Sequence, residues 1–373
     1  MNFVLLVPPV RTGGPEAVHQ LADALLSLGY SAYVHYAKEE RSSLQPAGEN
    51  NNQYPNYKGI RIIQDHSSLS DVVFILPEIW AHLALELARS HLVLVWWLSV
   101  DYGLLSLGRS ELDLYRSHPS ILNAYQSAYA KSFLQSLGLN SHDLPLSDYV
   151  QPSSSARDFR CGTAGQSITI CFSPYKGAWL STLFKKHHPE VHLVPIAGMS
   201  ANQVREALAD ADAYVEFGQL PGKDRIPREA LLVGTRVFIR QDGDGAFNSD
   251  WLLPESSYFN ASDCISGALM NVIHSELMSD SLLWQRARQK VIGEKDVFLN
   301  ECRHIAKTCS QLIHHSDVHS ALKDQINAVQ RHPDPLEIIE IKLDSILKST
   351  SWEITAPLRR AAAMIRRIAP WPS

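Results

Sequence analysis

The fold class of this chain is decided by residues 2–36, NFVLLVPPVRTGGPEAVHQLADALLSLGYSAYVHY. The run NFVLLV is apolar without alternation, which is typical of a strand that is covered on both faces. After RTGGP, apolar residues recur every three or four positions from Val18 to Leu28, and Gly29 follows them, so the pattern predicts a helix that ends at a glycine. SAYVHY is then expected to be a second strand. Strand, helix and strand in succession indicate a parallel βαβ unit.

The same alternation continues along most of the chain. In the first half, DVVFIL (71–76) and LVLVWWLSV (92–100) are expected strands on either side of a helix near 79–89. QPSSSARDF (151–159) is rich in proline and serine, breaks the pattern, and is the expected linker. A second series follows, with expected strands at SITICF, VHLVPI, YVEFG and TRVFI. We therefore expect an α/β fold with two doubly wound domains that face a cleft, followed by helices.

The expected units are an N-terminal α/β domain over 1–158, a second α/β domain over 159–315, a helix over 316–348 and a basic amphipathic tail over 349–373. Helix ends can also be predicted within this scheme. Ser200 with Gln203 three residues later predicts a capping box. Pro227 is expected at the first position of a short helix and Gly234 at its end.

The composition excludes several classes of protein. The 373 residues are 45% hydrophobic and 20% charged, so the chain is globular rather than disordered or fibrous. The net charge is −5, from 34 basic and 39 acidic side chains, so no nucleic-acid partner is expected and any anion site must be local. Five cysteines without a CxxC pair indicate reduced thiols in a cytoplasmic protein. The longest apolar run, LVLVWWLSV, is too short to span a bilayer.

Charged residues are crowded in one loop of the second half, within FGQLPGKDRIPREALLVGTRVFI (217–239). Lys223 and Arg225 stand beside an expected helix N-terminus, where cations and free N–H groups together suit a diphosphate. Glu229, one turn into that helix, is placed to accept hydrogen bonds from ribose hydroxyls. The alternative is a solvated loop whose ion pairs contribute little to stability.

Two other loops that follow expected strands have a similar character. In RTGGPEAVHQ (11–20), Gly13 and Gly14 allow close approach of an anionic ligand. A tight turn, with Pro15 at the first helical position and Glu16 favourable to the helix dipole, explains the same residues. In SPYKG (173–177), Lys176 reaches either a phosphate or solvent.

Carboxylates and aromatic residues follow two strands of the first half. Glu78 and Asp101 stand at the expected carboxyl ends of these strands, where they suit general-base catalysis or sugar binding, or else cap a helix or turn. Core packing is expected for at least one of Trp96 and Trp97. His19 lies one turn inside the glycine-loop helix and is either solvated or a catalytic candidate. The sequence shows no HExxH motif, no DxD-like acidic pair before an apolar strand and no Cys/His cluster, so neither a metal nor another cofactor is expected.

Several motifs together resemble a known group of enzymes. GGPEAVHQLADALLSLGY, WWLSVDY, QSAYAKSFL with LSDYV, PYKG and FGQLPGKDRIPREA resemble bacterial surface-polysaccharide glycosyltransferases of the GT-B fold. The resemblance covers most of residues 1–260, and PGKDRIPREA is its most specific element. It implies an N-terminal domain that holds the acceptor glycan and a C-terminal domain that binds a nucleotide-sugar donor.

The resemblance also implies roles for the candidate residues. The donor diphosphate is expected to contact Lys223, Arg225, Lys176, Gly13 and Gly14. Ribose and sugar contacts are expected from Glu229, Glu216 and Gly222. The catalytic candidates are Asp101, His19 and Glu16, with Asp101 as the base if the reaction inverts, and the acceptor side is expected to contain Glu78 and Trp97. Positive charge at the departing diphosphate would take the place of a metal ion.

The C-terminal tail suggests where such an enzyme would work. Within residues 357–371, two pairs of arginines lie seven positions apart on one expected helical face, an apolar face lies beside them, and Trp371 follows. A basic amphipathic helix of this kind suits an anionic membrane surface, and packing on this protein or a partner is the alternative. A membrane-surface position, at the inner face of the cytoplasmic membrane, would be explained by a lipid-linked acceptor.

Two other functions use the same features. One is a GT-B-like sugar-nucleotide epimerase or hydrolase, and the other is a non-catalytic nucleotide- or sugar-binding subunit of a larger synthase. In the non-catalytic case Asp101, His19 and Glu78 would be replaceable without loss of function. In a transferase their replacement would lower turnover more than donor binding.

Overall fold

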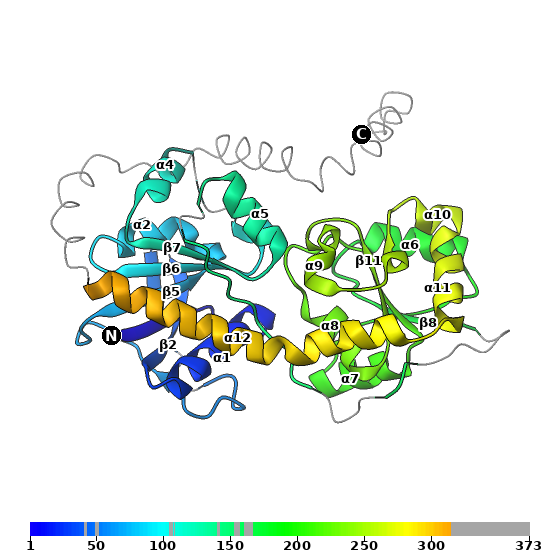
Figure 1. Cartoon of the computed structure of the whole chain (residues 1–373), viewed down its shortest axis with the longest axis horizontal. Coiled ribbons are helices and arrows are strands. Elements are labelled where there is room, and N and C mark those ends of the chain that lie inside the picture. The colour runs from blue at the N-terminus through cyan, green and yellow to red at the C-terminus, as the bar shows by residue number, and fades with distance from the viewer. Residues whose placement is uncertain are drawn as a thin grey trace.

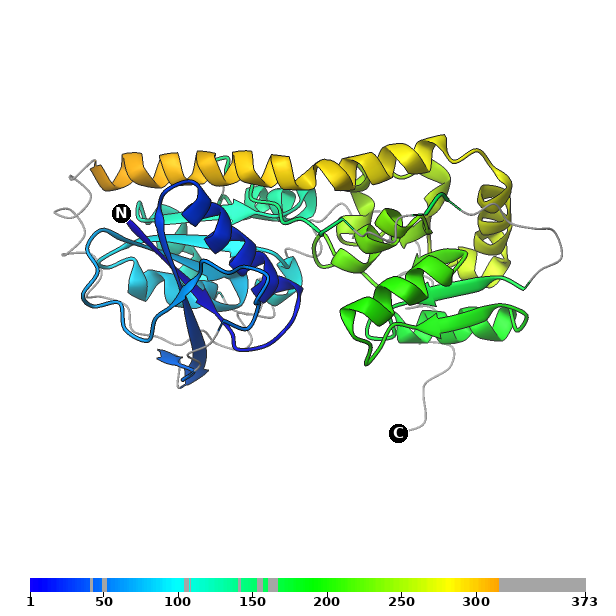
Figure 2. The same cartoon turned by 90° about the horizontal axis from the view of Figure 1, so that it is seen from below.

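The structure is a computed structural model that describes residues 1–40, 43–48, 52–103, 107, 109–139, 142–152, 157–159 and 167–314. Two α/β domains, each built on a parallel sheet, lie side by side, and one long helix runs along both of them (Figures 1 and 2). The predicted α/β fold with two such domains is therefore confirmed. The predictions for 316–348, for the tail at 349–373 and for Cys161 lie outside the described residues.

The N-terminal domain is built on a sheet with the strand order β3-β2-β1-β5-β6-β7, in which β4 pairs with β2. Its strands are β1 (Asn2–Val7), β2 (Ser31–Glu40), β3 (Ser43–Pro46), β4 (Arg61–Ile62), β5 (Val72–Pro77), β6 (Leu92–Trp97) and β7 (Ile121–Tyr125). Its helices are α1 (Gly13–Ser27), the 3₁₀ helix η1 (Glu78–Leu83), α2 (Ala84–Leu87), α3 (Val100–Gly103), α4 (Arg109–Ser117) and α5 (Ala128–Ser136). Among these described strands, every pairing is parallel except that of β2 with β3.

Helices cover both faces of this sheet, which explains the continuous apolar run in its first strand. Phe3, Leu5 and Val7 pack in the core beneath α1, whereas Val4 and Leu6 pack in the core on the opposite face with η1, α2 and α5. Because both side-chain rows of β1 are buried, neither row can be polar.

The C-terminal domain is built on a sheet with the strand order β12-β11-β10-β8-β9, and all its described pairings are parallel. The strands are β8 (Thr169–Phe172), β9 (His192–Pro195), β10 (Ala213–Glu216), β11 (Arg236–Arg240) and β12 (Tyr258–Phe259). The helices are α6 (Ala178–His187), α7 (Ala201–Asp210), α8 (Arg225–Val233), η2 (Asp244–Ala246), α9 (Asn248–Trp251), η3 (Glu255–Ser257), α10 (Asp263–Ser266), α11 (Ala268–Met278) and α12 (Leu282–His314).

The predicted helix C-termini are confirmed. Gly29 follows α1 with φ of +86°, and Gly234 ends α8 with φ of +94°, both in the left-handed region that favours glycine. The capping box of Ser200 and Gln203 is also present at the start of α7.

Two helices begin two residues earlier than the sequence predicts. α1 begins at Gly13 rather than at Pro15, and α8 begins at Arg225 rather than at Pro227. Each proline is therefore the third helical residue. The first turn tolerates proline at every position because its N–H groups have no intrahelical partner.

Each sheet has a switch point at the domain interface. β1 lies between β2 and β5, and β8 lies between β9 and β10. Loops that leave the carboxyl ends of such strands are the usual place for a ligand in open α/β sheets. Here loops from the two domains touch, because the N–H of Val100 donates to the carbonyl of Pro221 at 2.8 Å.

Helix α12 belongs to both domains. Trp284, Ala287 and Val291 pack in the core of the C-terminal domain. Phe298 and Cys302, further along the same helix, pack in the N-terminal core beneath α1. The grouping of 159–315 into one domain therefore does not describe the second half of α12. The periodicity of a helix shows its apolar face but not the sheet that this face covers.

The described cysteines, Cys171, Cys264, Cys302 and Cys309, are buried free thiols. In the part of the chain that the structure describes, every helix is too short or too polar to cross a membrane.

Candidate functional site

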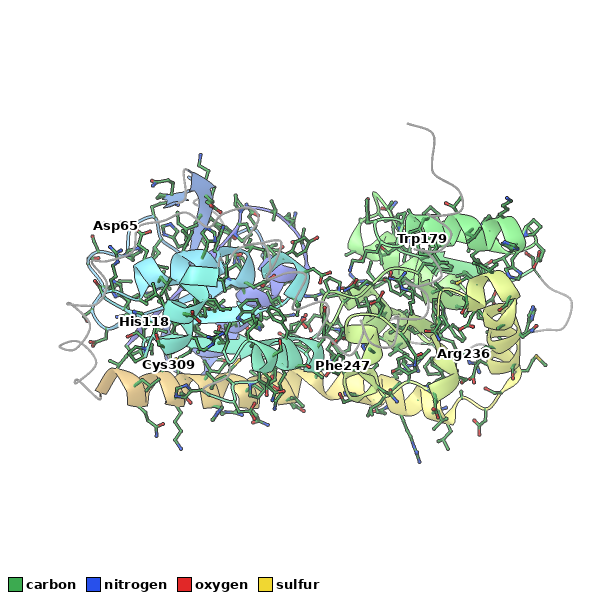
Figure 3. All side chains as sticks on the ribbon, turned by 90° about the horizontal axis from the view of Figure 1, so that it is seen from above. Asp65, His118, Trp179, Arg236, Phe247 and Cys309 are labelled. Carbon is green, nitrogen blue, oxygen red and sulfur yellow. The ribbon has the colours of Figure 1, made fainter. Side chains whose placement is uncertain are left out.

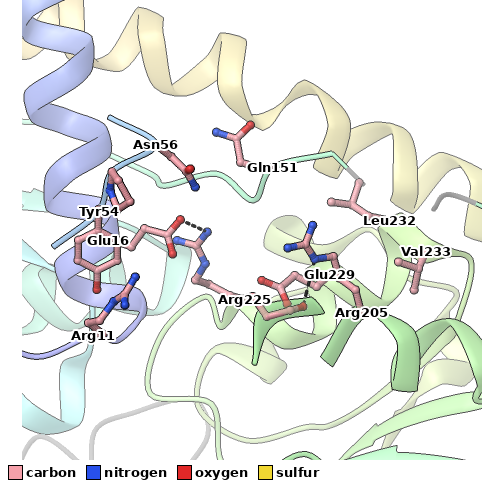
Figure 4. A pocket seen from close by; sticks show the side chains of 12 residues that line it. Arg11, Glu16, Tyr54, Asn56, Gln151, Arg205, Arg225, Glu229, Leu232 and Val233 are labelled. Carbon is pink, nitrogen blue, oxygen red and sulfur yellow. Dashed lines mark hydrogen bonds and ion pairs between the residues drawn. The ribbon is translucent and has the colours of Figure 1, made fainter. Parts of the chain in front are cut away.

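A cavity of about 420 Å³ lies between the two domains (Figure 4). It is bounded by the start of α1, residues 54–56, the linker at Gln151, and helices α7 and α8. Its lining residues are Arg11, Glu16, Tyr54, Pro55, Asn56, Gln151, Ala201, Arg205, Arg225, Glu229, Leu232 and Val233. This volume falls in the range of about 300–1,000 Å³ that is usual for small-molecule sites.

The cavity is rich in arginine. Arg11 comes from the N-terminal domain, and Arg205 and Arg225 come from α7 and α8. Arg225 contacts the facing domain, because its Nη2 lies 3.2 Å from Oε1 of Glu16. Nη1 of Arg225 has no hydrogen-bond partner among the described residues. Three guanidinium groups around one cavity suit an anion with several oxygens, such as a diphosphate.

Glu229 lines the same cavity one turn along α8 from Arg225. Burial raises the pKa of Glu229, while Arg225 and Arg228 act in the opposite sense. A half-buried carboxylate next to cations is placed to accept hydrogen bonds from the hydroxyls of a ligand whose anionic part contacts those cations.

Beneath the charged loop lies a buried cluster of ions formed by Lys223, Arg228, Asp148 and Glu294. Arg228 is fully buried, with Nη2 2.7 Å from Oδ1 of Asp148 and Nη1 2.9 Å from Oε2 of Glu294. Nζ of Lys223 lies 2.7 Å from the other oxygen of Glu294. Burial opposes the charge of Asp148, but Arg228, Arg225 and Lys223 lower its pKa. The cluster joins α8 to α12 and to the segment that enters the linker.

Lys223 is therefore placed differently from the sequence expectation. Its side chain is 6% exposed and does not line the cavity, so its ammonium faces Glu294 rather than a ligand. Arg225, two residues later, does line the cavity. The expected contact of Lys223 with a diphosphate stays a prediction that this placement does not favour.

The loop at Gly222 is pressed against the N-terminal domain. A Cβ atom on Gly222 would lie 2.1 Å from the carbonyl oxygen of Leu98, so only glycine fits. The N–H of Lys223 donates to Oε1 of Gln126 at 3.0 Å, and Nε2 of Gln126 donates to Asp148 at 2.8 Å. Gly222 therefore lies in a contact between the two domains and does not line the cavity.

The glycine loop of the N-terminal domain does approach α8. A Cβ atom on Gly13 would lie 3.0 Å from Cδ of Arg225, whereas one on Gly14 would be in ordinary contact with Leu98 at 3.8 Å. Glu16 lines the cavity and also accepts a hydrogen bond from the hydroxyl of Tyr57 at 3.2 Å. The structure therefore brings Gly13, Glu16, Arg225 and Glu229 together.

Lys176 and Glu216 lie near the charged loop but outside the cavity. Lys176 forms an ion pair with Asp224, the N-cap residue of α8. Glu216 is buried and accepts hydrogen bonds from the hydroxyl of Tyr214 at 2.7 Å and the N–H of Gly218 at 3.1 Å. Burial and Asp224 raise the pKa of Glu216 to about 7. Neither residue lines the cavity at Arg225.

His19 is buried beneath the cavity rather than exposed in it. Its Nδ1 lies 2.7 Å from the carbonyl of Pro15 and its Nε2 lies 2.8 Å from the hydroxyl of Tyr36. Because a carbonyl only accepts, Nδ1 carries the proton and Nε2 accepts from Tyr36. Burial lowers the pKa of His19, in agreement with a neutral ring. Both nitrogens are thus engaged within the domain, which does not suit proton transfer with a substrate.

The two acceptor-side candidates are also buried. Trp97 is a core residue whose Nε1 donates to Asn123 at 2.9 Å, so it presents no face to an acceptor. Glu78 accepts a hydrogen bond from the N–H of Leu98 at 3.1 Å, and burial raises the pKa of Glu78 to about 8. Glu78 therefore holds the end of β6 in place, and its raised pKa favours the protonated form at neutral pH.

Replacing Glu78 by glutamine is expected to remove a pH dependence of stability. An unfolded glutamate has a pKa of about 4.3, so between about pH 4 and pH 8 the native state holds a proton that the unfolded state has lost. The wild type should lose up to about 1.4 kcal/mol of unfolding free energy per pH unit across this window, relative to Glu78→Gln. Urea unfolding of both proteins at pH 5, 6, 7 and 8 measures this, and parallel pH profiles would contradict the assignment.

Asp101 is the second residue of α3, at the edge of the domain interface. Its carboxylate and that of Asp242, in the C-terminal domain, both act on Tyr129, whose pKa is raised mainly by burial and further by these two groups. Asp101 is half-buried and does not line the cavity at Arg225. Its catalytic role stays a prediction.

Sequence reasoning missed both Arg11 and Arg205 of the cavity and the carboxylates of the buried cluster. Asp148 lies within LSDYV, one of the motifs quoted above, so a signal for it was present. Glu294 lies in a polar stretch of α12 with no motif around it. Within the described ranges, no group of three His, Cys, Asp or Glu side chains is arranged to hold a metal ion.

The architecture is similar to that of several solved glycosyltransferases. Sucrose-phosphate synthase from Thermosynechococcus elongatus superposes with a TM-score of 0.57 at 11% identity, over 85% of this chain and 100% of that chain. A glycosyltransferase from Rickettsia africae gives 0.55 at 13% identity, over 84% and 99%. Anabaena HepE in complex with UDP gives 0.54 at 11% identity, over 83% and 100%. This chain has the GT-B fold.

No protein-family model matches the sequence, and no curated protein sequence is significantly similar to it. At these low identities the likeness shows the fold. The residues that line the cavity with three arginines come from both domains of this fold.

Proposed function

We propose that this protein is a glycosyltransferase that moves a sugar from a nucleotide-sugar donor to a glycan acceptor. The observation that carries the proposal is the interdomain cavity of a GT-B fold, lined by Arg11, Arg205, Arg225 and Glu229. The solved structure of Anabaena HepE contains UDP, and that of the catalytic domain of Arabidopsis starch synthase IV, with a TM-score of 0.52, contains ADP and acarbose. These ligands support a nucleoside diphosphate as the occupant of the cavity.

In this proposal each residue acts through its charge and its position in the cavity. The arginines hold the diphosphate and stabilise the negative charge that develops on it when the bond to the sugar breaks. Glu229 accepts hydrogen bonds from the ribose hydroxyls. The acceptor sugar would enter beside Asp101, whose carboxylate acts as the general base if the anomeric configuration is inverted.

The setting of the reaction is also part of the proposal. Surface-polysaccharide synthesis, a lipid-linked acceptor and work at the inner face of a bacterial membrane rest on the sequence motifs and on residues 357–371, which lie outside the described residues. Transfer without a metal rests on the arginines, which supply the positive charge that a metal ion would otherwise provide.

Nucleotide binding tests the proposal directly. We expect UDP, GDP, dTDP or ADP, or one of their sugars, to raise the Tm of the full chain by several degrees, since a ligand at about 100 times its Kd adds about 2.7 kcal/mol. Arg225→Ala should abolish the shift. Arg303→Ala, which changes an exposed arginine of α12 outside the cavity, should retain it. A panel in which no nucleotide shifts the wild type would exclude this donor site.

The pair of Arg225 and Glu16 predicts the effect of a second substitution. Glu16 occupies part of the hydrogen-bonding capacity of Arg225 and places a negative charge in the cavity. A donor diphosphate must compete with it, so Glu16→Gln should bind the nucleotide about fivefold more tightly, equivalent to about 1 kcal/mol. Isothermal titration calorimetry measures this. A fall in kcat without tighter binding would instead favour the catalytic role predicted for Glu16 from the sequence.

A further inference from the structure

A second cavity, of about 310 Å³, lies in the N-terminal domain on the side away from the domain interface. It is enclosed by the β2–β3 hairpin, by residues 64–66 and by η1 with α2. Figure 3 shows Asp65, at its rim, on the outer side of this domain, remote from the C-terminal domain. The lining residues are Leu6, His35, Leu44, Gln45, Pro46, Gln64, Asp65, His66, Phe74, Leu83, Glu86 and Leu87. None of these residues lines the interdomain cavity.

The central polar group of this cavity is the imidazole of His35, on β2. His35 is only 6% exposed, and its Nδ1 has no hydrogen-bond partner among the described residues. The ring of His66 lies 6.1 Å from that of His35 and packs edge-on against Phe74 at 4.8 Å. A buried ring nitrogen without a partner costs free energy, so a bound group that satisfies it is favoured.

The charge of the lining limits the chemistry of that group. Asp65 and Glu86 place carboxylates at the rim, which disfavours an anion. Burial lowers the pKa of His35, with His66 acting in the same sense and Asp65 against it, which favours the neutral ring. The Nδ1 of a neutral imidazole is a donor in one tautomer and an acceptor in the other. A hydroxyl can pair with it in both cases, because a hydroxyl both donates and accepts.

The walls and the rim together match one class of ligand. Leu6, Leu83 and Phe74 form apolar walls, while planar amide and carboxylate groups stand at Gln64 and Asp65. A sugar ring has apolar C–H faces and a belt of hydroxyls, and so uses both kinds of surface. The volume, at the lower end of the range for small-molecule sites, suits one or two sugar units.

We propose that this cavity is a second saccharide-binding site, which binds a neutral sugar unit of a glycan away from the site of transfer. The choice of a saccharide rests in part on the proposed glycosyltransferase function. A polymeric acceptor would be held by the N-terminal domain at two separate places, which keeps the chain associated with the enzyme between transfers.

Saturation-transfer NMR on the full chain tests the site. The probes are the methyl glycosides of glucose, galactose, mannose, rhamnose and N-acetylglucosamine, together with maltose, lactose and cellobiose, each with and without excess UDP or ADP. We expect at least one of them to bind the wild type, and nucleotide to leave the signal unchanged. His35→Phe keeps the ring but removes its nitrogens and should weaken binding about fivefold to tenfold, the loss of one buried hydrogen bond.

Two further variants complete the test. Leu44→Trp, at the partly exposed hairpin, fills the cavity and should abolish the signal. His118→Phe changes another buried histidine that also has a ring nitrogen without a partner but lines neither cavity, and should retain it. The proposal is overturned if none of these sugars binds the wild type, or if binding persists unchanged in Leu44→Trp. Nucleotide-induced shifts in Tm report separately on the interdomain cavity, so the two proposals can fail independently.

Discussion

Replacing Arg228 by methionine is expected to lower the free energy of unfolding by about 3–5 kcal/mol. Arg228 is fully buried and contacts Asp148 at 2.7 Å and Glu294 at 2.9 Å. Methionine has similar length but no charge, so two buried carboxylates would lose their main partner. Among the described residues, Lys223 and the more distant Arg225 would still pair with them, and Gln126 would still donate to Asp148. Urea unfolding monitored by circular dichroism measures the change.

A matched control is available on the surface. Arg116 pairs with Asp113 at 2.7 Å and donates to the carbonyl of Leu137 at 2.9 Å, but the Arg116 and Asp113 side chains are 42% and 76% exposed. Arg116→Met should therefore cost less than about 1 kcal/mol, as is usual for exposed pairs. The triple variant Arg228→Met, Asp148→Asn, Glu294→Gln removes the buried charges together and should recover part of the loss. If Arg228→Met costs no more than Arg116→Met, the buried cluster is not the stabilising contact described above.

Gly222→Ala is expected to lower turnover by about a hundredfold, the usual consequence of moving reacting groups by about 1 Å. The new methyl group would lie 2.1 Å from the carbonyl oxygen of Leu98 and 3.0 Å from Oε1 of Gln126, so the loop must move away from the N-terminal domain. That movement would disturb the hydrogen bond from Val100 to Pro221 and shift Arg225, three residues further along the chain. Steady-state kinetics with the donor identified by the binding panel measure the effect.

Gly293→Ala provides the comparison. Gly293 lies within α12, and a Cβ atom there would have no neighbour within 4 Å. Alanine in a helix interior is favoured over glycine by about 1 kcal/mol, so this variant should be slightly more stable and fully active. Equal activity of the two variants would show that the contact between Gly222 and Leu98 is not needed for turnover.

The α/β fold could be predicted from the sequence because its signals are local. The run in β1 is apolar at every position because both faces of that strand are covered, and Gly29 and Gly234 end their helices in a conformation that glycine adopts at little cost. Two helix starts were placed late because proline is tolerated throughout a first turn.

The candidate site was predicted only in part. Arg225 and Glu229 do line the cavity, whereas Lys223, two residues before Arg225, is turned into the buried cluster with Glu294. Nothing in the sequence around these residues distinguishes the two cations. Their orientations follow from what α12 places beneath the loop, and the polar stretch around Glu294 gave no sign of this contact.

The sequence by itself thus determined the alternation of strands and helices that defines the fold class, the ends of several helices and the loop in which charge gathers. These depend on neighbours within a few positions. Only the tertiary structure decided that α12 spans both domains, that His19 and Trp97 are buried, and that Arg225 meets Glu16 from 209 positions away. Such pairings depend on how two separately folded sheets pack against a shared helix, and no local periodicity records that arrangement.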